Sequence, residues 1–173
     1  METIFFDADN DGDQDVYIVM GGNESPKNDA SYIDQLYIND GQENFELSTD
    51  KIPQIPVSGQ HVIAQDLNDD GWTDLIVFGR QTAQAYPESP ASFIYMNENG
   101  TFFDRTQDWA PQFQELGMVT DAIFANVDED KELELIIVGE WMPITVFDMS
   151  EGKYKNITTE IGLSETVGWW NTI

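Results

Sequence analysis

The 173-residue sequence predicts an all-β fold made of repeated antiparallel sheets, and three observations lead to this prediction. Acidic nonapeptides begin at residues 7, 66 and 126, about sixty residues apart, and each lies between two apolar segments. Further apolar segments and glycine-containing turns follow each nonapeptide in the same order. No segment shows a sustained helical periodicity. Four short strands per repeat at this period are typical of a β-propeller blade.

Each predicted blade begins with a short apolar strand that leads into an acidic loop. We place these first strands at residues 4–6, 61–64 and 122–125. A second, strongly apolar strand leaves each loop and ends at glycine, at residues 16–21, 75–79 and 135–139. Because its residues are apolar on both faces, we expect the second strand to lie between neighbouring blades.

A third and a fourth strand complete each repeat. The third strands are expected at residues 35–38, 92–95 and 144–147, and turns follow them at residues 39–41, 99–100 and 151–152. The fourth strands begin near aromatic residues, namely Phe45, Phe102, Phe103 and Tyr154. The repeats then span residues 1–54, 55–115 and 116–166, and residues 167–173 begin a fourth blade.

Three blades are too few to close a ring, because propellers contain roughly four to eight. We therefore interpret the sequence as a partial β-propeller from inside a longer protein, with any export signal upstream. The remaining blades, or another copy of the chain, are expected to cover the apolar faces at its two ends.

The composition indicates a folded and strongly acidic protein. The chain contains 33 Asp and Glu but only 7 Lys and Arg, which gives a net charge of −26. Such a surface repels nucleic acid and anionic lipid, so neither is an expected partner. Cysteine is absent, which excludes disulfides and thiol chemistry. No apolar run is long enough to insert into a membrane as a helix.

The acidic loops carry the pattern of a cation site. They read DADNDGDQD, DLNDDGWTD and NVDEDKELE, with oxygen-bearing side chains at positions 1, 3, 5 and 9. Alternating oxygen ligands on a tight turn favour Ca²⁺. The first loop would use Asp7, Asp9, Asp11, the carbonyl of Asp13, and Asp15. The second loop would use Asp66, Asn68, Asp70, the carbonyl of Trp72, and Asp74.

The third loop departs from this pattern. Lys131 replaces the glycine at position 6, and an ammonium group competes with a bound cation. A third site of lower affinity would use Asn126, Asp128, Asp130, the carbonyl of Glu132, and Glu134. None of the loops is an EF-hand, because the twelfth position, where an EF-hand needs glutamate, holds an apolar strand residue.

The pattern D-x-D-x-D-G-x-x-D between strands resembles the FG-GAP/VCBS repeats of integrin-α-like β-propellers. The segments YPESPASFIYMNENGTFFD, GMVTDAIFANVDED, VGEWMPITVF and GWWNTI further resemble bacterial surface propellers that are often joined to an ASPIC/UnbV domain. This resemblance covers essentially the whole chain. It implies an extracellular protein, secreted or attached to the outer membrane, that uses calcium-stabilised blades in adhesion and binds carbohydrate or protein.

The residues themselves leave three functions open: a non-enzymatic binding scaffold, part of a secreted polysaccharide lyase or hydrolase, and a structural spacer. We favour the scaffold because no catalytic constellation is visible. His61 is the single histidine and is interpreted as a packed or channel-facing strand residue. Three tryptophans are interpreted as blade packing in preference to a sugar-stacking platform, namely Trp141, Trp169 and Trp170. Arg80 and Glu140 follow the second-strand glycines and are either ligand contacts or rim charges.

Overall fold

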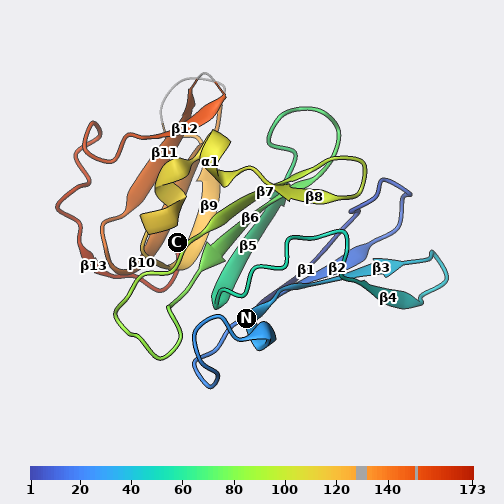
Figure 1. The fold of residues 1–173 in the computed structure, drawn as a ribbon. Helices are drawn as coiled ribbons and strands as arrows, with labels where there is room; N and C mark the ends of the chain where they lie inside the picture. Colours follow the sequence, from blue (N-terminus) through green and yellow to red (C-terminus); the bar gives the residue numbers. More distant parts are fainter. Residues whose placement is uncertain (128–131, 151) are drawn as a thin grey trace.

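The computed structural model describes residues 1–127, 132–150 and 152–173. It contains three consecutive antiparallel sheets that are arranged side by side as blades of a β-propeller fragment (Figure 1). The first sheet contains β1 (Glu2–Phe6), β2 (Asp15–Val19), β3 (Gln35–Asn39) and β4 (Phe45–Ser48). The second sheet contains β5 (Gly59–Gln65), β6 (Asp74–Gly79), β7 (Phe93–Asn97) and β8 (Phe102–Asp104). The predicted all-β fold of four-stranded blades is confirmed.

The third sheet contains β9 (Met118–Ala125), β10 (Glu134–Met142), β11 (Thr145–Ser150) and β12 (Lys153–Asn156). β10 continues beyond Gly139, where the sequence predicted that it ends, because two strands provide hydrogen-bond partners there. One is the start of β9, and the other is the two-residue β13 (Gly168–Trp169), which pairs with Glu140 and Met142. The same sheet therefore receives the beginning of the segment that was predicted to start a fourth blade.

Short helices fill the connections between strands. They are η1 (Ala30–Tyr32), α1 (Thr106–Trp109) and η2 (Pro111–Glu115). α1 and η2 lie between the second and third blades, where Phe113 is fully buried. Among the described residues, no helix has the length and apolar character needed to cross a membrane.

The core consists of two layers, one on each side of the second blade. All six residues of β6 are buried. Leu75 and Val77 join the layer shared with the first blade, whereas Ile76 and Phe78 join the layer shared with the third. Side chains alternate between the two faces of a strand, so the middle of β6, residues 75–78, is apolar at every position. The predicted burial of this second strand on both faces is confirmed.

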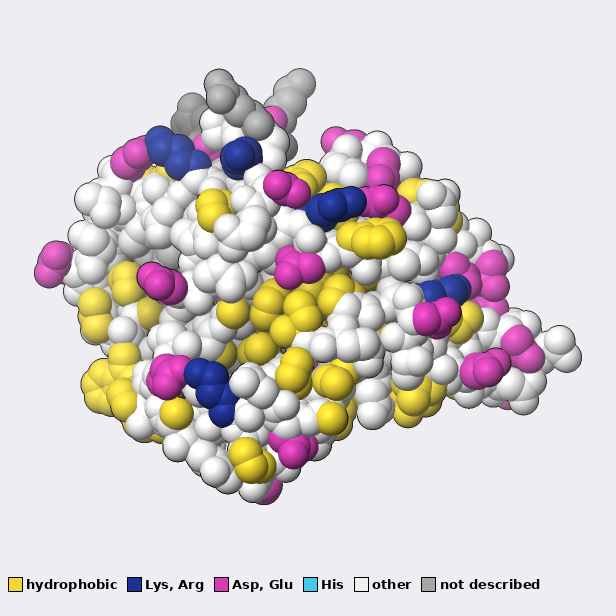
Figure 2. Space-filling view, viewed as in Figure 1, with side chains coloured by type: hydrophobic (Ala, Val, Ile, Leu, Met, Phe, Trp, Pro, Cys, Tyr) yellow, Lys and Arg dark blue, Asp and Glu magenta, His cyan; other side chains and the backbone are white. Residues whose placement is uncertain are grey.

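The two ends of the blades are chemically different. Figure 1 shows the loops β1–β2 and β5–β6 at the top of the molecule and the loops β2–β3 and β6–β7 at the bottom. We call these the acidic-loop end and the opposite end. Figure 2 shows acidic side chains scattered widely over one face, with few basic ones between them, as the net charge of −26 requires.

Candidate metal centre and the opposite end

The first two acidic loops adopt the same backbone turn. The fourth position has a positive φ in both, with 59° at Asn10 and 59° at Asp69, and the glycine at the sixth position follows with 95° at Gly12 and 88° at Gly71. Asn, Asp and Gly are the residues that tolerate this left-handed conformation best. The shared sequence pattern therefore encodes a shared turn.

The first loop brings three of its predicted ligands together. Ligand oxygens of Asp7, Asp9 and Asp15 all lie within 4.8 Å of one another. The Oδ1 atoms of Asp7, Asp9 and Asp13 are buried and have no hydrogen-bond partner among the described residues. Buried polar atoms are normally paired, so several unpaired carboxylate oxygens in one loop form a set of acceptors that a cation would satisfy. The donor set of hard oxygens fits a calcium ion.

Asp13 differs in detail from its predicted role, which was to offer its backbone carbonyl. Its carboxylate also turns into the loop and contributes one of the unpaired oxygens. Desolvation, reinforced by repulsion from Asp11 and Asp15, raises the pKa of Asp13 above its usual value. A group that resists ionisation among neighbouring carboxylates is stabilised in its charged form by a cation.

The ninth-position acids tie each loop to its own sheet. Asp15 is fully buried, and its carboxylate accepts hydrogen bonds from the N–H groups of Ala8 at 2.7 Å and Asn39 at 2.8 Å. Asp74 does the same with Leu67 at 2.9 Å and Asn97 at 2.7 Å. Desolvation raises the pKa of Asp74 to about 6, although both hydrogen bonds lower it. These carboxylates thus have a structural role besides any role as ligands.

The second loop satisfies its oxygens internally. Asp66 accepts from Gly71 N–H at 2.8 Å and from Asp70 N–H at 3.2 Å. The Asn68 side-chain amide donates to Asp70 Oδ2 at 2.9 Å, and Trp72 N–H donates to Asp70 Oδ1 at 2.8 Å. The predicted ligands of this loop are therefore close together, but they are engaged with one another and with the backbone.

The third loop lies only partly within the described residues. Asp128 and Asp130, both predicted ligands, fall outside them. Glu134 is fully buried and accepts a hydrogen bond from Val127 N–H at 2.6 Å, as Asp15 and Asp74 do from the second residue of their loops. Its Oε1 atom is buried without a partner in the described part of the chain. The predictions for Asn126 and Glu132 as ligands stay predictions.

Sequence reasoning missed the contacts between the first loop and other parts of the molecule. The Lys51 ammonium lies 3.3 Å from Asp9 Oδ2, although the two residues are far apart in sequence. Asn97, at the end of β7, donates from its side chain to the carbonyl of Ala8 at 2.8 Å, and Asn10 donates to the carbonyl of Gly71 at 3.0 Å. The first loop therefore joins the first blade to the second. No local pattern could have predicted these contacts.

The innermost strands carry a row of polar side chains that includes the single histidine. His61 Nδ1 lies 2.8 Å from Glu2 Oε2, and His61 Nε2 lies 3.0 Å from the carbonyl oxygen of Ala122. Asp121 Oδ1 lies 3.6 Å from the same nitrogen. Since Glu2, His61 and Asp121 occur at corresponding positions of β1, β5 and β9, this row connects three blades. The nearby Ser58 hydroxyl is hydrogen-bonded to the Gly22 backbone.

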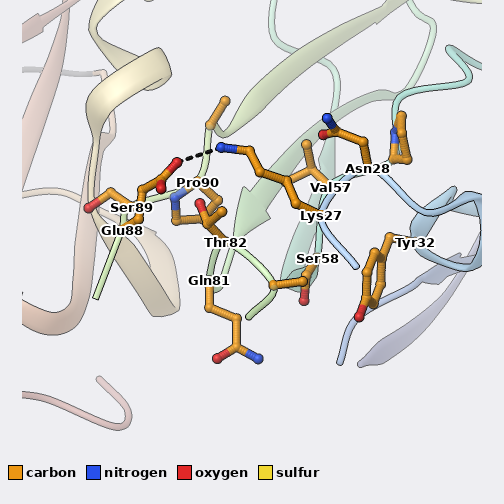
Figure 3. Close-up of a pocket in the computed structure, with 13 residues that line it drawn as sticks. Lys27, Asn28, Tyr32, Val57, Ser58, Gln81, Thr82, Glu88, Ser89 and Pro90 are labelled. Carbon is orange, nitrogen blue, oxygen red and sulfur yellow. Dashed lines mark hydrogen bonds and ion pairs between the residues drawn. The ribbon is translucent and has the colours of Figure 1, made fainter. Parts of the chain in front are cut away.

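The opposite end has a pocket between the first two blades (Figure 3). The loops β2–β3 and β6–β7 enclose a cavity of about 230 Å³, and Tyr32 and Val57 contribute to its walls. The Lys27 ammonium and the Glu88 carboxylate form an exposed ion pair of 2.5 Å between the two loops. Exposed ion pairs of this kind contribute little stability, so a ligand can replace the contact between Lys27 and Glu88 at a small cost in free energy.

The sequence comparison supports the family suggested by the acidic loops. Residues 7–77 match the model of the FG-GAP-like repeat. The matched segment contains the first loop, the whole first blade after β1, and the second loop with most of β6. The matched segment thus covers the first and second acidic loops, which are more similar to each other than either is to the third. No curated protein matches the chain significantly.

Proposed function

We propose that this FG-GAP-like propeller is a calcium-stabilised binding scaffold of a bacterial surface or secreted protein. The observation that supports this most directly is the set of unpaired buried carboxylate oxygens of Asp7, Asp9 and Asp13 in the first loop. Calcium modules of extracellular proteins typically bind in the ~0.1–1 mM range, and a loop on the protein surface is suited to such an environment.

Electrostatics explains why the cation would act on folding. Two carboxylates about 4 Å apart repel each other by roughly 4 kcal/mol at an effective dielectric constant of 20. Ligand oxygens of Asp7, Asp9 and Asp15 lie within 4.8 Å of one another, so without a cation their repulsion destabilises the compact form of the loop. A divalent ion reverses the sign of the interaction. Because Asn10 and Ala8 contact the second blade, an ordered first loop would also hold two blades together.

The ligand would bind at the opposite end. Its loops vary in sequence between repeats, whereas the acidic loops repeat one pattern. The cavity of about 230 Å³ between the first two blades is of a size that takes a small group such as a sugar ring or a peptide side chain. Carbohydrate and protein are both compatible with this arrangement, and either ligand is compatible with an adhesion role of the parent protein.

Calorimetry with calcium tests the proposal. We expect saturable binding of at least one Ca²⁺ by the chelator-treated protein, and a higher melting temperature in calcium than in EDTA. Magnesium at the same concentration serves as the control, because it prefers a smaller octahedral site and stabilises less. If the protein binds no calcium at about 5 mM, and if EDTA does not change its melting temperature, then the loops are only solvated turns.

A further inference from the structure

A cluster of exposed aromatic side chains occupies the opposite end beside the third blade. Trp141 is 59% exposed, Trp169 is 54% exposed and Tyr86 is 50% exposed. The rings of Trp141 and Trp169 are 5.3 Å apart between centroids and are inclined by 67°. The sequence interpretation assigned Trp141 and Trp169 to packing between blades. The structure instead leaves about half of each side chain in contact with solvent.

Hydrogen bonds hold this aromatic cluster in a defined arrangement. The Trp141 indole N–H donates to the Tyr86 hydroxyl at 2.6 Å, and that hydroxyl lies 3.4 Å from Glu140 Oε2. Glu140 is buried and forms an ion pair with Arg80. Arg80 Nη1 is also buried and has no hydrogen-bond partner within the described ranges. The cluster therefore combines aromatic faces with a carboxylate, Glu140, that Arg80 holds in a fixed position.

The backbone at Trp141 is unfavourable for a tryptophan. Its φ of 59° is a left-handed conformation that costs a non-glycine residue on the order of 1 kcal/mol or more. Gly22 occupies the corresponding position in the first repeat, where φ is 153°, a value that glycine adopts without strain. The third repeat thus keeps a large, half-exposed aromatic side chain at a position where glycine would be more stable. Strain of this kind is concentrated at binding sites.

A separate cavity of about 260 Å³ adjoins the cluster, and Trp141, Tyr86, Glu140 and Met118 contribute to its lining. Ser89 lines both this cavity and the pocket between the first two blades, so the two hollows share one surface. Figure 2 shows hydrophobic side chains at the left margin, where Figure 1 places β13. Exposed apolar groups beside fixed polar groups are the usual composition of a ligand site.

We propose that Trp141, Tyr86 and Trp169 form a carbohydrate-binding subsite for neutral oligosaccharides. This inference rests on the proposed scaffold function and names its ligand class and place. The apolar face of a pyranose ring stacks on an indole, while its hydroxyls pair with polar groups beside the ring. The Tyr86 hydroxyl and the Glu140 carboxylate, which line the cavity, provide these groups, and Arg80 holds Glu140 in place. The net charge of −26 repels polyanionic glycans, so the ligand is an uncharged sugar.

Titration with three neutral hexasaccharides tests the subsite: cellohexaose, β-1,4-mannohexaose and chitohexaose. Isothermal calorimetry and tryptophan fluorescence measure binding in calcium-containing buffer. We expect at least one to bind saturably, and Trp141→Gly to weaken it about tenfold or more. This variant removes the indole and relieves the positive φ, so its melting temperature should stay unchanged or rise. Phe45→Ala is the matched control, because Phe45 is a similarly exposed aromatic residue on the first blade.

Tyr86→Ala provides a second test of the same subsite if Trp141→Gly lowers the melting temperature. It should weaken sugar binding comparably, and Tyr86→Phe should have an intermediate effect because the ring is kept and the hydroxyl is lost. The subsite is overturned if none of the sugars binds at about 5 mM, or if both variants bind as tightly as the unmodified chain. The scaffold proposal fails by a separate result, namely a melting temperature that is the same with and without calcium.

Discussion

The first and second acidic loops share a backbone turn but differ in how their oxygens are used. In the first loop, three carboxylate oxygens are buried without a partner. In the second loop, the Asn68 side-chain amide donates a hydrogen bond to Asp70, and backbone N–H groups donate to both carboxylate oxygens of Asp66. The two loops differ at two positions that bear on this contrast. Asn68 stands where the first loop has Asp9, so the second loop contains its own donor, and Trp72, which has no carboxylate, stands where the first loop has Asp13.

The comparison shows that spacing determines the turn, whereas the identity of each side chain determines the charge inside it. The first loop concentrates negative charge, and its carboxylates repel one another. The second loop is stabilised by its own hydrogen bonds, so we expect it to gain less from a cation. A repeat motif can thus keep one turn geometry while the pairing of its side chains differs between copies.

The largest expected effect concerns what the two loops have in common, the ninth-position acid. Asp15→Ala or Asp74→Ala leaves two buried backbone N–H groups without an acceptor and should lower the free energy of unfolding by about 3 kcal/mol. Chemical denaturation in EDTA measures this loss. Asp69→Asn is the control, because Asp69 is exposed and asparagine also tolerates its positive φ. A loss below about 0.5 kcal/mol for Asp74→Ala would mean that these carboxylates are ligands only.

The calcium response should distinguish the two loops. At calcium 100 times above the dissociation constant, a filled site adds about 2.7 kcal/mol. We expect Asp9→Asn to remove most of the calcium-induced rise in melting temperature, and Asp70→Asn to remove less. The reciprocal change, Asn68→Asp, should lower stability in EDTA and increase the calcium response. Equal responses in Asp9→Asn and Asp70→Asn would show that the unpaired oxygens of the first loop have no special role.

The sequence predicted the regular parts of this molecule and missed the contacts that distinguish the repeats. The apolar run Leu75 to Phe78 predicted a strand buried on both faces, because alternation alone places its side chains in two layers. The loop spacing predicted the turns. The proximity of Lys51 to Asp9 and the conformation of Trp141 were not predictable, since both depend on how segments far apart in the sequence fold against one another. Local patterns carry no information about such pairings.

A partly buried acid outside the acidic loops allows the pH response of the loops to be separated from that of the rest of the blade. Desolvation raises the pKa of Asp34 to about 7, although Met20 N–H and the Tyr17 hydroxyl both donate to it. The folded state therefore holds this proton more tightly than the unfolded state, and stability should fall as pH rises from about 4 to 7.

Asp34→Asn should remove that part of the pH dependence and raise stability at pH 8 by about 1 kcal/mol. Thermal unfolding from pH 5 to 8 in saturating calcium measures the effect, because the cation keeps the loop carboxylates ionised throughout. Asp40→Asn serves as the control, since its side chain is exposed and its pKa is lowered by hydrogen bonds from Asn44 and Gln42. An unchanged pH profile in Asp34→Asn would show that Asp34 is not the group whose proton the folded state holds more tightly.

The smallest expected effect concerns Lys51, the cation that the first loop already has. Its ammonium lies 3.3 Å from Asp9 Oδ2 and partly compensates the loop in the absence of metal. Lys51→Met keeps the aliphatic stem and removes the charge, so it should cost about 0.5 kcal/mol in EDTA. The same change should tighten calcium binding severalfold, because no ammonium competes for Asp9. Calorimetry of both proteins decides the point. Weaker calcium binding in Lys51→Met would mean that Lys51 holds Asp9 in position for the metal. Asn68 holds Asp70 in the second loop in a similar way, so that result would imply that the second loop is also arranged to bind calcium.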